Sequence, residues 1–117
     1  MTRFGLALLL TALSAGAVAQ EQAPNRREFT ITANDHRFTP DRLEVSQDDL
    51  VKITLRSEGQ PHSFAIDAYR IVKRAGANQT IAFEFRANRP GSFEFYCSLT
   101  SDPECRNMKG TLVVKQK

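Results

Sequence analysis

The chain has 117 residues, enough for a single domain, with 25% charged and 41% hydrophobic residues. Its 16 basic and 13 acidic side chains give a formal net charge of +3, and no basic stripe with interleaved aromatic residues is present, so nucleic-acid binding is disfavoured. No hydrolytic triad, phosphate-binding loop or paired-carboxylate site can be assembled from this sequence, and we do not expect an enzyme.

The first 19 residues have the pattern of a cleaved export signal. A positive start at Arg3 precedes an apolar run over residues 4–15, which the small-residue pattern Ala17-Val18-Ala19 follows. The run is too short to serve as a membrane anchor, and no cysteine lies near the cleavage site to carry a lipid. We therefore expect cleavage after Ala19 and a secreted or periplasmic protein without a stable membrane anchor.

After the signal comes a polar arm over residues 20–27, which we expect to be flexible and to precede one domain over residues 28–117. Runs typical of strands, most of them alternating apolar and polar residues, occur at residues 29–33, 43–45, 51–56, 62–66, 81–86, 91–96 and 111–115. The stretch 69–76 is less periodic, and we predict a crossover segment there. Short strands separated by turns predict an all-β fold, an antiparallel Greek-key β-sandwich or barrel.

A loop between the last two predicted strands carries both cysteines, Cys97 and Cys105, together with Met108. Phe93, Phe95 and Cys97 alternate along the preceding strand, so we expect the Cys97 thiol to point inward with the aromatic side chains. Thiolate and thioether sulfurs are soft ligands that select copper, above all Cu(I). Two cysteines in an oxidising compartment usually form a disulfide instead. The loop therefore has two interpretations, a copper site and a short disulfide loop.

The sequence contains only two histidines, and both lie at junctions between a predicted strand and a loop. His62 follows Pro61 and opens a predicted strand on the face that it shares with Phe64, where an imidazole can be held rigidly toward a metal. The simpler interpretation of His62 is a partly exposed turn residue. His36 lies two residues before Phe38, and the simpler interpretation, an exposed loop residue, is favoured there. Met108 has an equally simple alternative as core filler.

The chain resembles the cupredoxin family of small copper-binding β-sandwiches from Glu28 to Lys115. The matching segments are Phe38-x-Pro40, Ser57-Glu58-x-x-Pro61-His62-Ser63-Phe64-Ala65-Ile66, Arg89-Pro90-Gly91-x-Phe93-x-Phe95-Tyr96-Cys97 and Met108-Lys109-Gly110-Thr111-Leu112-Val113-Val114. The resemblance implies a cupredoxin-like sandwich in which His62, Cys97 and Met108 are copper ligands.

The ligand loop departs from the family pattern at one position of the site. Mononuclear blue copper sites resemble this set plus a second histidine between the cysteine and the methionine, and here Cys105 stands at that position. The loop has the length of the binuclear copper loop of cytochrome oxidase subunit II, but Ser101 replaces the second bridging cysteine. The resemblance also places His36 near the copper-bearing end of the sandwich, where it is a candidate for the missing imidazole.

Three functions follow from these observations. The leading one is a one-electron carrier with a mononuclear copper site of His62, Cys97, Cys105 and Met108, whose second thiolate favours Cu(II) and predicts a lower potential than an ordinary blue copper protein has. The second is a periplasmic Cu(I) carrier or metallochaperone. The third is a metal-free binding module stapled by a Cys97–Cys105 disulfide. We expect a monomer whose partner is a redox protein or a copper-accepting enzyme.

Overall fold

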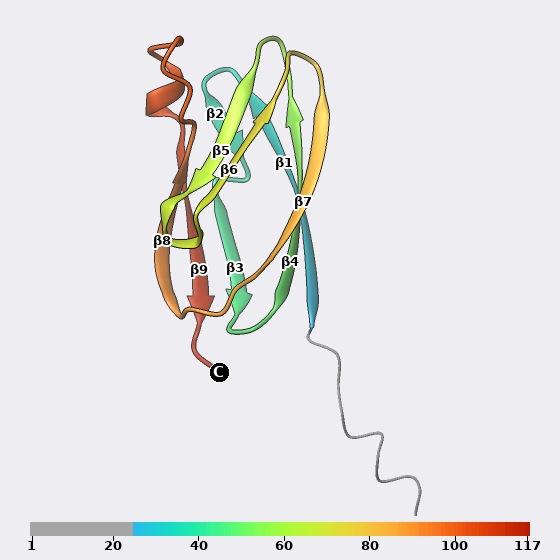
Figure 1. The fold of residues 1–117 in the computed structure, drawn as a ribbon, viewed down its shortest axis with the longest axis vertical. Coiled ribbons are helices and arrows are strands. Elements are labelled where there is room, and N and C mark those ends of the chain that lie inside the picture. The colour runs from blue at the N-terminus through green and yellow to red at the C-terminus, as the bar shows by residue number, and fades with distance from the viewer. Residues whose placement is uncertain (1–24) are drawn as a thin grey trace, which may run out of the picture.

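The computed structural model describes residues 25–117, which form two β-sheets packed face to face (Figure 1). The expected signal peptide over residues 1–19 lies outside the described residues, as does most of the expected arm over residues 20–27. The first strand begins at Arg26 and so includes the last two residues of that arm. Within residues 25–117 no helix has the length and apolar character needed to cross a membrane.

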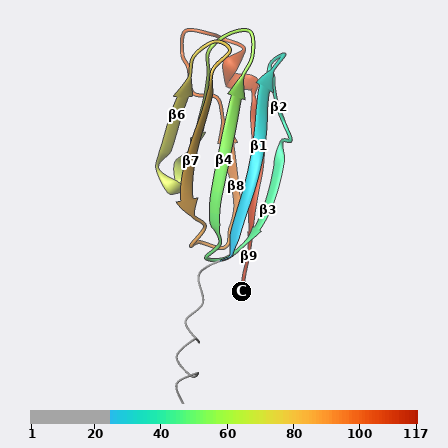
Figure 2. The ribbon, with the colours of Figure 1, turned by 90° about the vertical axis from the view of Figure 1, so that its right-hand side faces the viewer.

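Each sheet combines strands from distant parts of the chain. The first sheet has the order β2-β1-β4-β7. Its strands are β1 (Arg26–Asn34), β2 (Arg37–Thr39), β4 (Leu50–Ser57) and β7 (Thr80–Arg86). The second sheet has the order β3-β9-β8-β5-β6. Its strands are β3 (Arg42–Ser46), β5 (His62–Ile66), β6 (Ile71–Ala75), β8 (Gly91–Tyr96) and β9 (Lys109–Lys115). Figure 2 shows β1 and β4 in front of β8 and β9.

The prediction of an all-β sandwich is confirmed, but the prediction that its sheets are antiparallel is wrong for two strand pairs. β1 pairs in parallel with β4, and β3 pairs in parallel with β9, whereas the remaining pairs are antiparallel. The chain leaves the first sheet after β2, adds β3 to the second sheet and returns as β4 beside β1. Because β2 runs antiparallel to β1 and the chain continues through β3 before it turns back, β4 runs in the same direction as β1.

A cluster of phenylalanine rings fills the space between the sheets next to the predicted ligand positions. Phe64 stacks on Phe95, with their ring centroids 4.7 Å apart, and both rings contact Phe38 edge-on. Phe64 and Phe95 are fully buried. Because these rings lie two residues from His62 and Cys97 along their strands, the aromatic core fixes the strands that carry both candidate ligands.

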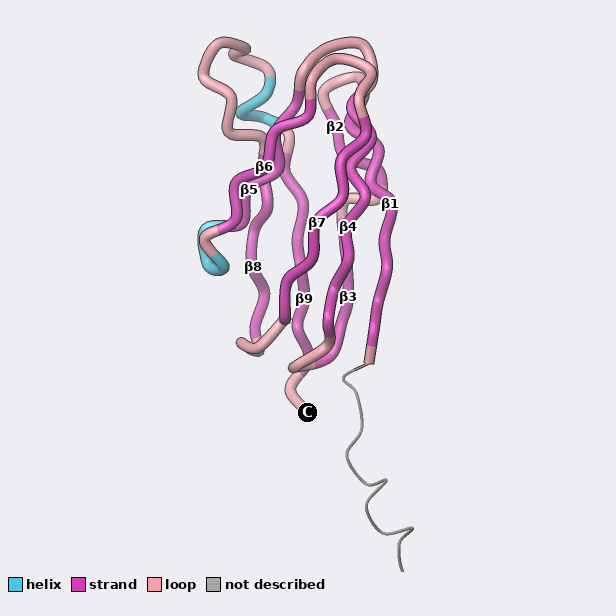
Figure 3. The backbone as a smooth tube through the Cα atoms, turned by 45° about the vertical axis from the view of Figure 1, so that its right-hand side comes forward, coloured by secondary structure: helices cyan, strands magenta, loops and turns pink. Residues whose placement is uncertain are grey.

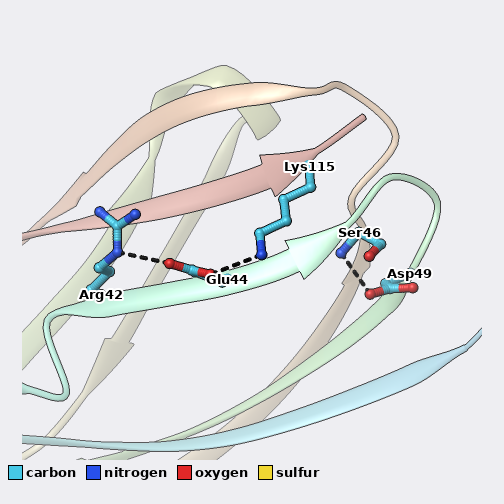
Figure 4. Close-up of polar contacts among 5 residues, drawn as sticks. All are labelled: Arg42, Glu44, Ser46, Asp49 and Lys115. Atoms are coloured by element: carbon cyan, nitrogen blue, oxygen red, sulfur yellow. Dashed lines mark hydrogen bonds and ion pairs between the residues drawn. The ribbon is translucent and has the colours of Figure 1, made fainter. Parts of the chain in front are cut away.

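Two short 3₁₀ helices, η2 (Asp67–Tyr69) and η3 (Cys105–Asn107), interrupt the second sheet's connections. The loops that follow β1, β4, β6 and β8 gather at one end of the sandwich together with η3 (Figure 3). At the opposite end the backbone N–H of Ser46 donates a 2.8 Å hydrogen bond to the Asp49 carboxylate, closing the turn between β3 and β4 (Figure 4). On β3, Glu44 makes ion pairs with Arg42 and Lys115 on the protein surface (Figure 4).

Strand β6 occupies the stretch where we predicted a crossover segment. Among the strands of residues 25–117 it is an edge strand, and its neighbour is β5. Val72, Lys73 and Arg74 are all exposed in succession, so the strand has no alternation of buried and exposed residues. The period of two that identifies a half-buried strand is therefore absent from its sequence.

Gly110 provides a test of how tightly the aromatic core is packed. A Cβ atom at this position would collide with the Phe95 ring and would lie 2.6 Å from the Asp41 carbonyl oxygen. We predict that Gly110→Ala lowers the free energy of unfolding by about 1–3 kcal/mol, because a buried ring and backbone must both shift. Urea denaturation of the metal-free protein measures this loss.

The matched control is Gly76→Ala. The nearest atoms to a Cβ at Gly76 belong to the end of the flexible Gln79 side chain, which can move away with the loss of the one hydrogen bond that it accepts from the Gly76 N–H. We expect a change in unfolding free energy smaller than that of Gly110→Ala, and equal losses for the two variants would contradict the packing argument.

Candidate metal centre

The four predicted ligands all lie at the loop end of the sandwich and are all buried. His62 is the first residue of β5, Cys97 follows β8, Cys105 begins η3, and Met108 precedes β9. Each of the four side chains is at most 1% exposed. The prediction that the Cys97 side chain points inward is confirmed, and the interpretation of His62 as a partly exposed turn residue is wrong.

Cys97 and Cys105 form a disulfide in this structure. In that oxidation state neither residue offers a thiolate to a metal. Among residues 25–117, no group of three or more His, Cys, Asp and Glu side chains is arranged to hold a metal ion. The structure thus contains the disulfide that the sequence left as one of two interpretations of the loop.

Polar hydrogens are directed at both sulfur atoms. The backbone N–H of Ser63 lies 3.4 Å from Cys97 Sγ, and the Ser63 hydroxyl lies 3.7 Å from the same atom. The backbone N–H of Leu99 lies 3.2 Å from Cys105 Sγ. The Ser63 hydroxyl also accepts a 2.6 Å hydrogen bond from the Ser98 backbone N–H. These contacts attach the start of the loop between β8 and β9 (residues 97–108, called the sulfur loop below) to β5, one residue after His62.

Backbone hydrogen bonds bring Met108 back to the two cysteines. The N–H of Cys97 donates to the Met108 carbonyl at 3.1 Å, and the N–H of Met108 donates to the Cys105 carbonyl at 3.0 Å. Asp102 accepts a further backbone bond from Cys105 as the loop turns into η3. The loop therefore returns to its starting point through main-chain contacts as well as through the disulfide.

A buried serine determines which ring nitrogen of His62 carries the proton. The Ser57 hydroxyl, 2% exposed, lies 2.7 Å from the Gln60 carbonyl and 2.8 Å from His62 Nδ1. A carbonyl only accepts, so the single hydroxyl proton of Ser57 is donated to Gln60. The hydroxyl oxygen then accepts from Nδ1–H of neutral His62, which leaves Nε2 as the ring nitrogen with a free lone pair.

Burial lowers the pKa of His62 from its ordinary value of 6.5, because desolvation penalises the imidazolium. The negative charge of Asp102 and the Gln60 carbonyl oppose this shift, whereas the positive charge of His36 adds to it. Desolvation is the largest of these effects, so neutral His62 is favoured.

Two side-chain contacts fasten the sulfur loop to neighbouring loops. Gln60 Nε2 donates a 2.6 Å hydrogen bond to Asp102, and His36 Nε2 lies 2.9 Å from a Glu104 carboxylate oxygen. These four residues line a shallow pocket together with Pro61, Arg74, Leu99, Ser101 and Pro103. His36 is 43% exposed and faces Glu104, so it contacts the ligand loop from outside.

Sequence reasoning did not assign roles to Ser57, Ser63, Gln60 or Asp102. The two serines lie inside the segment that carries the family resemblance, five residues before and one residue after His62. Their closeness to a candidate ligand in the sequence could have identified the two serines as residues that position His62 or Cys97. The partners of Gln60 and Asp102 depend on how two loops far apart in sequence meet, which no local pattern indicates.

The depressed pKa of His62 predicts a pH dependence of the metal-free protein. Between the pKa of the folded state and about 6.5, the unfolded chain binds a proton that the folded protein does not bind, so stability falls as the pH is lowered through this interval. A histidine titration by NMR should give a midpoint for His62 below 6.5. A midpoint at or above that value would contradict the proposed burial of the neutral ring.

The comparison with known proteins agrees with this architecture. The family model for the cupredoxin-like domain matches residues 5–114. Auracyanin A, a blue copper protein from the green thermophilic photosynthetic bacterium Chloroflexus aurantiacus, aligns with a TM-score of 0.66 at 18% identity, covering 78% of this chain and 100% of that chain. The Cu(I)-containing metal-binding domain of the Cu(I)-exporting P-type ATPase of Streptococcus pneumoniae aligns with a TM-score of 0.64 at 15% identity, covering 80% of this chain and 90% of that chain.

A third similar structure is the copper nitrite reductase of Nitrosomonas europaea, with a TM-score of 0.65 and 23% identity over 80% of this chain and 42% of that chain. At these identities the structural similarity establishes the fold. The family match spans most of the sequence, and the chain belongs to the cupredoxin-like domain family.

Proposed function

We propose that this protein is an exported copper-binding protein that carries one electron at a mononuclear site of His62, Cys97, Cys105 and Met108. The site forms when the cysteines are reduced. Export is inferred from the sequence of residues 1–19, and copper from the donor set and the family.

The observation that supports the proposal is the burial of four metal-binding side chains at one end of a rigid sandwich, with N–H groups directed at both sulfurs. Three of the four residues are 1% exposed, namely His62, Cys105 and Met108, and Cys97 is fully buried. Hydrogen bonds to a cysteine sulfur stabilise its anionic form and tune the potential of a copper–thiolate site. Two thiolates, a thioether and a neutral imidazole are ligands that fit copper.

The protein's own residues would hold these donors in place. Ser57 fixes the His62 tautomer with Nε2 unprotonated, and Ser63 connects Cys97 to β5 through its backbone N–H. Bound copper would supply the one-electron couple. A scaffold that keeps ligands from rearranging between oxidation states favours fast electron transfer, and a second anionic thiolate favours Cu(II) and so a lower potential than in an ordinary blue copper protein.

The central experiment is to reduce the purified mature protein, load it with Cu(II) without oxygen, and record optical and electron paramagnetic resonance spectra. We expect one copper per chain and an intense thiolate-to-copper absorption that Cys97→Ser abolishes and Cys105→Ser shifts. Ser101→Ala is the matched control, since Ser101 lies on the same loop and is exposed. A disulfide that persists through reduction, with no copper bound, would overturn the proposal in favour of a metal-free binding module.

A second candidate, a Cu(I) carrier, is favoured by the position of His36. That imidazole is 43% exposed and paired with Glu104, so the buried donors comprise one imidazole and three sulfurs. Soft thiolate and thioether donors bind Cu(I) tightly, as a carrier of this ion requires. Tight anaerobic Cu(I) binding without a stable coloured Cu(II) form would select this function over electron transfer.

The Ser57 hydroxyl provides a further prediction. Ser57→Ala removes the acceptor for Nδ1–H of His62, so the ring loses its fixed tautomer and orientation, and copper affinity should fall about 10–100-fold. Competition titration with a copper chelator measures the affinity, and ¹⁵N shifts of His62 in the metal-free protein report the tautomer. Ser92→Ala, at an exposed position in β8, is the control. Unchanged affinity and tautomer would contradict the role of Ser57.

A further inference from the structure

The disulfide joins the two residues that would supply both thiolates of the proposed site. A sulfur atom in a disulfide cannot act as a thiolate ligand, so the bridged and the metal-binding states of this pair exclude each other. We infer that Cys97 and Cys105 form a thiol–disulfide switch, whose reduced form binds copper and whose oxidised form releases it. This inference rests on the proposed function and adds its regulation.

The backbone is suited to both states of the switch. The Cα atoms of Cys97 and Cys105 are 5.1 Å apart, a separation from which the two side chains reach either each other or one shared ion. Conversion between the states therefore needs side-chain rotation and a small loop adjustment. It does not need a rearrangement of the sheets.

Main-chain hydrogen bonds close the loop in addition to the disulfide. Tyr96 pairs with Lys109 at the end of the β8–β9 ladder, and the Cys97 N–H donates to the Met108 carbonyl directly beyond it. The η3 turn adds the bond from Met108 N–H to the Cys105 carbonyl. Because these main-chain bonds already close the loop, the disulfide is not needed to hold the two ends of the loop together. It can therefore be reduced while the loop stays closed.

The surroundings of the sulfurs favour the reduced, ligating state. Ser63 N–H is directed at Cys97 Sγ and Leu99 N–H at Cys105 Sγ. A disulfide sulfur is a weak hydrogen-bond acceptor, whereas a thiolate accepts such bonds strongly. The contact from Ser63 is buried and the contact from Leu99 is partly buried, and both gain most when the disulfide is reduced and the thiols are deprotonated.

Reduction requires a dithiol from outside the protein. The balanced exchange converts the Cys97–Cys105 disulfide and an external dithiol into two protein thiols and an external disulfide, with two electrons and two protons passing to the protein. On binding Cu(I) the two thiols release both protons. In an exported protein the reductant belongs to the class of dithiol oxidoreductases. In the reverse direction the two Cu(I)-bound thiolates pass two electrons to an external disulfide, which takes up two protons and becomes two thiols, while the Cys97–Cys105 bond forms and Cu(I) is released.

The test compares the oxidised and dithiothreitol-reduced forms of the purified mature protein, desalted without oxygen and titrated with Cu(I) from its bicinchoninate complex. We expect the oxidised form to bind Cu(I) about 100-fold more weakly or worse, because both thiolate donors are lost. In a second measurement, oxidised glutathione is added to reduced protein with and without one equivalent of Cu(I). Alkylation and mass spectrometry should then show disulfide formation slowed at least about tenfold by Cu(I), since the ion binds only the dithiol.

Each outcome decides a separate question. Equal Cu(I) binding by the two forms, or reoxidation that Cu(I) does not slow, would overturn the switch and leave the copper-binding function in place. Failure of both forms to bind Cu(I) would overturn the function and the switch together. In the control variant Cys105→Ser, which cannot form the bridge, Cu(I) binding should be the same before and after mild oxidation.

Discussion

The position of β8 at the centre of its sheet is the constraint on which the candidate site depends. β8 is hydrogen-bonded to β5 on one side and to β9 on the other, so its end meets the start of both neighbours. His62 opens β5 and Met108 precedes β9, and Cys97 lies between them at the end of β8. Strand pairing alone thus brings together residues that are up to 46 positions apart in the sequence.

Much of this architecture could be predicted because strands buried on one face have a period of two. Val51, Ile53 and Leu55 alternate with polar residues, and the structure buries all three. The same rule missed β6, whose exposed edge has no such period, and it does not distinguish parallel from antiparallel pairing. Pairing direction depends on how the chain crosses between layers, and local sequence carries little information about that path.

The site was predictable in part and for a different reason. Cys97 follows an alternating strand, so the direction of its side chain follows from the strand geometry. His36 shows where that reasoning ends. A regular strand would direct its side chain the same way as that of Phe38, but Asp35 and His36 both adopt positive φ angles, and the resulting turn places His36 at the surface, as the favoured interpretation of an exposed loop residue predicted. Which of its two possible states the cysteine pair adopts depends on an electron supply outside the chain, so the sequence leaves both open.

The edge strand β6 has a consequence for how the molecule behaves in a crowded solution. Its outer side offers unpaired main-chain groups to any other extended chain, and Val72, 66% exposed, would strengthen such an association. The adjacent Lys73 and Arg74 place two positive charges on the same short strand. A second copy approaching edge to edge would bring like charges together, so this edge is protected from self-templated aggregation by electrostatic repulsion.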